Sequence, residues 1–414
     1  MLRLRAVIDM RLLKSLFRKK GRSESLFRYL ISLSHLWLGL LSSVVLFIVC
    51  LAGSLYAFRT PYQQFQNREL LNAAVPKGES FLQADEIESL FHDRGMVIES
   101  IVLPSSKKKN LIVSYRESES NLSSTGYFNP YTGEEVEGHY NRSSEPFFQI
   151  LLGLHKNLLL GTTGKQVVGI SVIIFVILLL SGMILWWPKS RRWRTIKASL
   201  QVRWRANSFQ LNYSLHRVLG VYAFLPLLFI SLTGLYIAYP WMKNAVIITL
   251  GGEPILQQQA HADNQVSDAF AALMEEMMEK EAEKREGPQR TRFSISEIKA
   301  MADSYLDYPA TTTIVMADAE NPRYRVSKIN THNILGAKVT DAVTFDQKGE
   351  MRSLERFSDL PLHRQFIEIS LPLHTGEIIG LPGILLYALT SLIGCSLPVT
   401  GFLIWWKNAG RSGR

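Results

Sequence analysis

Four stretches of this sequence are long and apolar enough to cross a lipid bilayer as helices, which takes about 20 residues each. They lie near residues 29–58, 167–187, 211–239 and 378–406. The chain as a whole is 47% apolar but 20% charged, which is too charged for a bundle lying wholly in lipid. The sequence therefore predicts four transmembrane helices joined by sizeable segments outside the bilayer. The first stretch is too long for a cleavable signal peptide, so we expect it to remain as an anchor.

Basic residues gather in three segments next to these stretches: residues 1–28, the loop 188–208, which has no acidic residue, and the tail 407–414. Lys and Arg near the ends of spans are retained in the cytoplasm. We therefore expect both termini in the cytoplasm and two large segments on the opposite side, which is the periplasm if the membrane is a bacterial inner membrane. The net charge of +10 follows from this topology and suits contact with membrane lipid. No nucleic-acid partner is needed to explain it.

The sequence also contains an internal repeat. Glycines and tryptophans follow two histidines at the same offsets of 6, 9, 27, 31 and 32 residues. After His155 they are Gly161, Gly164, Gly182, Trp186 and Trp187, and after His374 they are Gly380, Gly383, Gly401, Trp405 and Trp406. In the other two spans, Gly39 and Gly53 follow His35 at offsets of 4 and 18, as Gly220 and Gly234 follow His216. Spans one and two are thus repeated as spans three and four, and each repeat begins on the same side, so the repeats are parallel.

The two segments outside the bilayer predict small α+β domains. Helix-like stretches begin at Leu82 and Ser294, and alternating strands follow at NLIVSYRE and RYRVSKI. Each segment then contains a turn sequence typical of a β-hairpin, YFNPYTGEEVEG in the first and TFDQKGEMRSLERF in the second.

These motifs together resemble a known family. The LH-x5-G-x2-G start and SGMILWWP end around the second span, the LHRVLG start of the third span, and the paired outer segments are similar to those of the PepSY-associated transmembrane helix family over nearly the whole chain. Members of that family include inner-membrane ferric-siderophore reductases with haem held by bundle histidines. The resemblance implies PepSY-like periplasmic domains and, as substrate, iron(III) chelated by a siderophore. It supports haem electron transfer better than any one substrate.

The expected fold is an α-helical membrane protein with four transmembrane helices in two parallel repeats and two small α+β PepSY-like periplasmic domains. In chain order, its parts are a basic cytoplasmic N-terminus (1–28), the first transmembrane helix (29–58), the first PepSY-like domain (59–150), an interfacial segment with the second transmembrane helix (151–187), a basic cytoplasmic loop (188–208), the third transmembrane helix (209–239), the second PepSY-like domain (240–372), an interfacial segment with the fourth transmembrane helix (373–406) and a cytoplasmic tail (407–414).

Each span carries one histidine at or near an end, namely His35, His155, His216 and His374. Ionisable residues at membrane depth are costly and are usually functional or paired. A single such histidine is equally well explained by a hydrogen bond in the headgroup zone, but four in matched pairs favour a cofactor. We expect all four to be axial ligands of haem iron, in two b-type haems.

Depth in the bilayer predicts how these histidines pair. His35 and His216 closely follow basic segments and should lie in the cytoplasmic half. His155 and His374 each lie 31 residues before a tryptophan at the cytoplasmic end, which is about 46 Å of continuous helix and exceeds the hydrocarbon thickness. These two should lie at the outer interface, on segments broken at Gly161 or Gly380. We therefore expect His35 to pair with His216, and His155 with His374.

Four neighbouring residues have two interpretations each. Gly39 and Gly220, one turn from His35 and His216, either let a flat porphyrin approach the backbone or serve ordinary helix packing. Arg217 and Lys156 each adjoin a histidine and either pair with haem propionates or extend to the interface.

Two histidines on one iron leave no open position for oxygen, so this ligation favours electron transfer. We expect a haem-dependent reductase of ferric siderophore or another iron(III) chelate, acting at the periplasmic face during iron uptake, with no side chain in a catalytic role. The chain has no nicotinamide, flavin, nucleotide, zinc-protease or serine-hydrolase motif. Its electron donor is therefore either a quinol in the bilayer or a cytoplasmic reductase that meets the basic loop.

Two other functions remain open. In a haem-free protein, the PepSY-like domains would bind peptides or inhibit a protease, the spans would be an anchor and their histidines would be packing residues. A transporter component would place its site near the midplane, away from these histidines. Cys50 and Cys395 lie within spans, and we expect no disulfide between them. The five remaining histidines should be surface residues: His92, His139, His261, His332 and His363.

Overall fold

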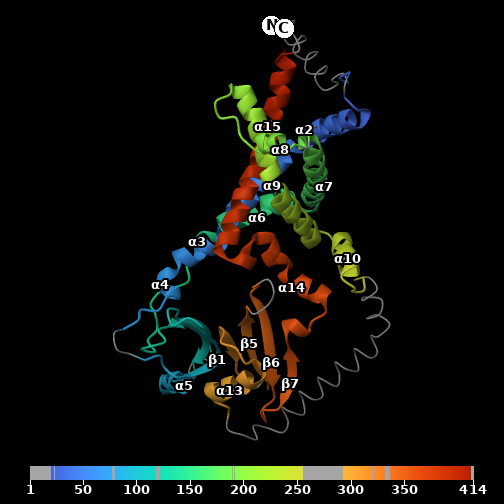
Figure 1. Cartoon of the computed structure of the whole chain (residues 1–414). Helices are drawn as coiled ribbons and strands as arrows, with labels where there is room; N and C mark the ends of the chain where they lie inside the picture. The colour runs from blue at the N-terminus through green and yellow to red at the C-terminus, as the bar shows by residue number, and fades with distance from the viewer. Residues whose placement is uncertain are drawn as a thin grey trace. The chain divides into compact units, whose positions relative to one another are not determined.

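The computed structural model describes residues 20–22, 24–76, 80–117, 122–188, 190, 192–254, 292–318, 321–331 and 336–411 (Figure 1). The chain divides into two compact units. The helical unit comprises residues 1–61, 143–243 and 370–414, and the sheet unit comprises residues 62–142 and 244–369. Most of the basic N-terminal segment lies outside the described residues, as do His261 and His332.

The helical unit contains the four expected spans. Its long helices are α2 (Leu26–Tyr56), α7 (Gly161–Trp186), α9 (Ser208–Ala238) and α15 (Leu381–Arg411). Their inner faces meet in a cluster that includes Leu46, Phe175 and Leu227. Outward-facing apolar residues such as Leu41 and Leu225 are 76% and 70% exposed. An apolar surface of this kind is unfavourable in water and suits the acyl chains of a bilayer.

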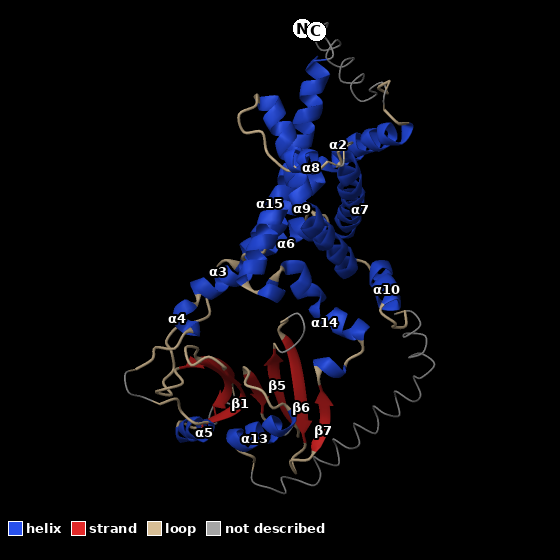
Figure 2. Cartoon of the chain, in the orientation of Figure 1, coloured by secondary structure: helices blue, strands red, loops and turns tan. Residues whose placement is uncertain are grey.

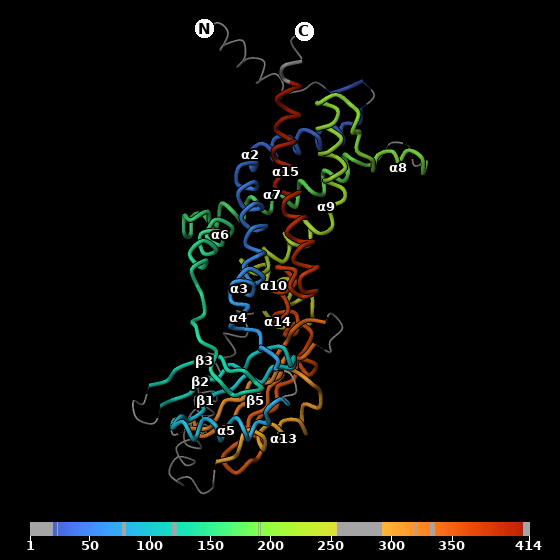
Figure 3. The backbone as a smooth tube through the Cα atoms, turned by 90° about the vertical axis from the view of Figure 1, so that its left-hand side faces the viewer, coloured from blue at the N-terminus to red at the C-terminus, as the bar shows by residue number. Residues whose placement is uncertain are grey.

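Short helices occur in both units. They include α3 (Arg59–Gln66), α4 (Arg68–Leu71), α6 (Glu145–Asn157), α8 (Trp193–Ser199), α10 (Pro240–Thr249), α14 (Leu362–Thr375) and the 3-10 helix η2 (Glu377–Ile379). Helix α4 lies wholly in the sheet unit, and α3, α10 and α14 cross the boundary between the two units. Figure 3 shows α8 projecting sideways from the long helices of its unit.

The predicted breaks before the second and fourth spans are both present. Helix α6 ends at Asn157, and Leu158 and Leu159 adopt positive φ angles before α7 begins at Gly161. Helix α14 ends at Thr375, and Gly376 and Gly380 have φ angles of 80° and 70° before α15 begins. Because neither histidine-bearing segment continues straight into its span, α6 and α14 can each pack at their own angle.

Among its described residues, the sheet unit is built on one antiparallel sheet of seven strands in the order β3-β2-β1-β4-β5-β6-β7 (Figure 2). The strands are β1 (Met96–Leu103), β2 (Leu111–Glu117), β3 (Ser123–Phe128), β4 (Thr312–Val315), β5 (Tyr324–Asn330), β6 (Val339–Phe345) and β7 (Met351–Glu355). Helices α5 (Ala84–Asp93) and α13 (Ile295–Tyr305) contribute Ile87, Phe91 and Ile298 to the core. The 3-10 helix η1 (Phe357–Asp359) follows β7.

The sequence predicts an α+β domain in each segment, whereas in the structure both segments share this sheet. The junction is the pairing of β1 with β4, in which Ile101 lies opposite Ile314. The second predicted hairpin is present as β6 and β7, with Gly349 in its turn. The first predicted hairpin is reduced to an isolated bridge between Phe128 and Glu135 after β3.

Charged residues buried in the sheet unit are paired with one another or with the backbone. The Lys328 ammonium is 3% exposed, and it donates to the carbonyls of Leu306 and Tyr308 and contacts Asp303 at 2.6 Å. Asp341, 2% exposed, accepts from the Tyr308 hydroxyl at 2.6 Å. Burial, together with this bond to a carboxylate, raises the pKa of Tyr308. Such satisfied pairs are typical of structural networks.

The β1–β4 junction gives a stability test. Ile101 is fully buried on β1, so Ile101→Ala should cost about 2–5 kcal/mol of the sheet unit's stability. Val97, on the same strand, is 42% exposed, and Val97→Ala should change it by no more than about 0.5 kcal/mol. Hydrogen exchange of the strand amides in the detergent-solubilised full chain measures both. Equal losses of protection would contradict the assigned facing of β1.

Candidate functional site

The structure brings the four predicted histidines together in two pairs. In the first pair, His35 on α2 and His216 on α9 have ring centres 6.4 Å apart. In the second pair, His155 on α6 and His374 on α14 have ring centres 6.1 Å apart. These are the pairs expected from the depth argument.

The separation within each pair suits one metal ion between two imidazoles. A bond from a metal to an imidazole nitrogen is about 2 Å long, and that nitrogen lies about 1 Å from the centre of its ring, so two opposed imidazoles on one metal have centres about 6 Å apart. Two imidazole rings that touch with no metal between them can have centres closer together than this. Both pairs are at the spacing that a shared metal requires.

Each histidine is held through Nδ1 by an oxygen atom on another helix. His35 Nδ1 lies 2.8 Å from Ser181 Oγ on α7, and His216 Nδ1 lies 2.9 Å from Thr400 Oγ1 on α15. His374 Nδ1 lies 3.0 Å from Thr233 Oγ1 on α9. His155 Nδ1 lies 2.9 Å from the carbonyl oxygen of Val49 on α2. This contact leaves the other ring nitrogen, Nε2, as the one that could bind a ligand.

A glycine on that same neighbouring helix lies against each ring. An added Cβ at Gly53 would lie only 2.7 Å from His155 Nδ1, and one at Gly234 only 3.0 Å from His374 Cε1. At Gly182 and Gly401 it would lie 3.3 Å from His35 Cε1 and 3.4 Å from His216 Cε1. The absence of a side chain at these positions is what lets each helix approach its imidazole.

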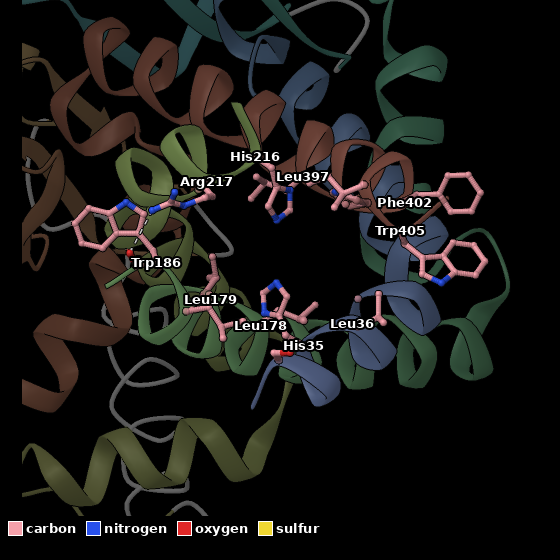
Figure 4. Close-up of a pocket in the computed structure, with 18 of the residues that line it drawn as sticks. His35, Leu36, Leu178, Leu179, Trp186, His216, Arg217, Leu397, Phe402 and Trp405 are labelled. Carbon is pink, nitrogen blue, oxygen red and sulfur yellow. Dashed lines mark hydrogen bonds between the residues drawn. The ribbon is translucent and has the colours of Figure 1, made fainter. Parts of the chain in front are cut away.

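A cavity of about 1300 Å³ surrounds the first pair. This is larger than a typical small-molecule pocket of about 300–1,000 Å³. Helices α2, α7, α9 and α15 all contribute to its mostly apolar lining. Figure 4 shows His35 and His216 pointing toward one another across this cavity. The space could hold a large, flat, apolar group with both imidazoles directed at its centre.

The flanking residues singled out from the sequence lie in different surroundings. Gly39 and Gly220 line the cavity, and the nearest side chains to an added Cβ there are leucines at ordinary contact distance. Arg217 also lines it, with its guanidinium 3.5 Å from the Trp186 carbonyl oxygen and 5.7 Å from the Tyr213 ring centre. Lys156 is exposed. Arg217 is therefore the better placed of the two cations for an anionic group in the cavity.

The two pairs lie at different levels of the bundle. On α2, His35 belongs to the first pair, while Gly53, 18 residues later, contacts His155 of the second. On α9, His216 and the second-pair contact Gly234 are also 18 residues apart. At about 1.5 Å per residue this separates the pairs by about 27 Å along the helices. That is close to the hydrocarbon thickness of a bilayer, about 30 Å.

The remaining predicted side chains stay apart from these pairs. His92 and His139 are exposed, as expected. His363 packs against Gly252 in the sheet unit. Cys50 and Cys395 are both free thiols, as expected.

Sequence reasoning missed the hydroxyl acceptors. Ser181, Thr233 and Thr400 each stand immediately before one of the glycines already marked by the repeat, Gly182, Gly234 and Gly401. The recurring Ser-Gly or Thr-Gly pair is therefore a pattern in the sequence that marks the positions of these hydroxyl groups. It could not be assigned because the sequence does not say which histidine each helix faces.

Comparison with known proteins agrees with this architecture. Over 124 residues the chain is 31% identical to the Uncharacterized protein PA4219 of Pseudomonas aeruginosa, a match that covers 26% of this chain. The matched part spans only 29% of that relative's length. The profile of the family described as PepSY-associated TM region matches residues 33–408, which is nearly the whole chain. With its four apolar helices, the chain is a membrane protein that belongs to the PepSY-associated TM region family.

Proposed function

We propose that this protein carries electrons across a bacterial inner membrane through two b-type haems and reduces ferric siderophore or another iron(III) chelate at the periplasmic face. The observation that carries the proposal is the pair of imidazoles found at each of two levels of the bundle, at the separation a shared iron requires. His35 and His216 would hold one haem, and His155 and His374 the other.

The residues around the first pair fit such a group. The cavity there is large, mostly apolar and entered by two imidazoles from opposite sides. Haem would supply a reversible one-electron couple when bound, with His35 and His216 as the residues that would hold it. The chain's own part is to position the four Nε2 atoms, exclude water with the surrounding leucines, and offer Arg217 to a carboxylate at the cavity wall.

The arrangement of the helix ends supports the direction of transfer. The contacts of His35 with α7 and of His216 with α15 gather the starts of α2 and α9 and the ends of α7 and α15 at one level. The basic loop 188–208 and Lys407 adjoin these ends. Basic residues at span ends favour the cytoplasmic side, so the first pair would face the cytoplasm and the second pair the periplasm.

On this topology the sheet unit is periplasmic and PepSY-like, and the spans form two parallel repeats. The matched histidine contacts of α2 with α7 and of α9 with α15 support the repeat. A quinol or a cytoplasmic reductase would supply one electron at a time to the first haem. Each electron would convert one chelated iron(III) to iron(II) beside the second haem.

Absorption spectra of the detergent-purified protein test this proposal. We expect a sharp low-spin α-band after dithionite and about two haems per chain by pyridine haemochrome, as two histidine pairs require. A colourless protein after haem-supplemented expression would instead favour the haem-free alternative, in which the sheet unit binds peptides or inhibits a protease.

Single histidine variants separate the two sites. His155→Ala or His374→Ala should remove one haem and abolish reduction of an external iron(III) chelate, because these residues would hold the haem nearest the substrate. His35→Ala or His216→Ala should leave that haem bound and slow its reduction from the donor side. Haem content and stopped-flow reduction report both effects, and equal haem loss from all four variants would contradict the pairing.

Alanine substitutions at the four glycines that lie against the imidazoles should reduce haem binding to different extents. Gly53→Ala and Gly234→Ala would push a methyl group to within 3.0 Å of an imidazole and should displace the second haem. The contacts at Gly182 and Gly401 are looser, at 3.3 and 3.4 Å, so Gly182→Ala and Gly401→Ala should retain more of the first haem. Haem stoichiometry of the four proteins measures the series, and the reverse order of loss would refute the packing argument.

A further inference from the structure

We infer that Ser181, Thr233 and Thr400 are positioning residues that fix the proton of three histidines on Nδ1 and so keep Nε2 as the metal-binding nitrogen. This inference rests on the proposed function for its redox consequence, but its geometric basis is independent of any cofactor.

Each of the three hydroxyl groups has a backbone carbonyl of its own helix within hydrogen-bond distance. Ser181 Oγ donates to the Leu178 carbonyl at 3.2 Å. Thr400 Oγ1 lies 2.9 Å from the Ser396 carbonyl oxygen, and Thr233 Oγ1 lies 2.9 Å from that of Phe229. A hydroxyl has one proton, and a carbonyl oxygen can only accept. We infer that each hydroxyl proton points back into its own helix, so that the nearby imidazole donates and carries its proton on Nδ1.

For His155, a proton on Nδ1 follows from a contact with a backbone carbonyl. The spacing of the repeat matches Ala52 to Thr233 and Val49 to Ile230. Thr233 Oγ1 lies 3.0 Å from the Ile230 carbonyl oxygen, whereas His155 Nδ1 bonds directly to the Val49 carbonyl at 2.9 Å. His374 also interacts with the backbone at Ile230, so the two rings share the carbonyl contact and His155 lacks only the hydroxyl. All four rings therefore present the same tautomer, and only His155 does so without a side-chain acceptor.

A hydrogen bond from Nδ1 changes the ligand as well as its orientation. A metal-bound imidazole that donates its other proton is more basic, and it stabilises the more highly charged state of the metal. Ser181 and Thr400 should thus lower the potential of the haem in the first pair, and Thr233 that of the haem in the second. Backbone contacts of His155 with Val49, of His374 with Ile230 and of His216 with Leu397 would remain in these variants, because no side-chain substitution removes a carbonyl.

Spectroelectrochemical titration of the full-length protein tests this inference. Ser181→Ala and Thr400→Val should raise the midpoint potential of the first haem and leave the second unchanged, while Thr233→Val should do the opposite. Haem affinity at the altered site should fall about tenfold. Ser181→Thr, Thr233→Ser and Thr400→Ser keep the hydroxyl and should restore wild-type values.

Ser42→Ala is the matched control, because Ser42 is a buried hydroxyl on α2 that donates to the Leu38 carbonyl of its own helix. It should shift neither potential. Unchanged potentials in Ser181→Ala, Thr233→Val and Thr400→Val would overturn the positioning role. Equal shifts of both haems in each variant would also overturn it, since they would report a general loosening of the bundle.

Nitrogen NMR of the haem-free protein labelled at histidine keeps this test separate from that of the proposed function. Protons on Nδ1 of the four rings are expected, and protons on Nε2 would overturn the inference even in a protein that binds haem. A protein that never binds haem but shows Nδ1 protons would refute the proposed electron transfer and leave the tautomer assignment standing.

Discussion

Helix packing in this protein depends on one repeated contact, in which an imidazole of one helix shares a hydrogen bond with an oxygen on the next helix and lies against a glycine there. It joins α2 to α7, α9 to α15, α6 to α2 and α14 to α9. Within a bilayer, lipid tails are as apolar as leucine side chains, so burial alone gives helices little reason to associate in one arrangement. Small residues and interhelical hydrogen bonds set the arrangement instead, and here both occur at the same four places.

The broken helices follow from that contact. If α6 continued straight into α7, His155 would lie beyond the end of the bundle and would not contact α2 or His374. The left-handed residues Leu158 and Leu159 redirect the chain, and the three hydrogen bonds between Arg59 and Glu145 hold α6 beside the extension of α2. Backbone strain of this kind persists only where surrounding contacts impose it.

Much of this organisation could be predicted from the sequence. The spans follow from apolar length, and the histidine pairs follow from matched spacing and depth. The pairing of β1 with β4 could not be predicted, because it depends on two short strands from separate segments meeting edge to edge. The acceptors Ser181, Thr233 and Thr400 were equally hidden, since a hydroxyl in an apolar helix usually bonds its own backbone and shows its second partner only when the neighbouring helix is placed.

The strand order of the sheet has a consequence for how the protein is made. Without the second segment, β1 is the last strand of a three-stranded sheet and presents an unpaired edge. Its partner β4 emerges from the ribosome only after α7 and α9 have been synthesised, so the membrane must accept two further spans before the edge is covered. An exposed strand edge invites pairing with other chains. During biogenesis the first segment therefore passes through an incomplete state with an unpaired strand edge.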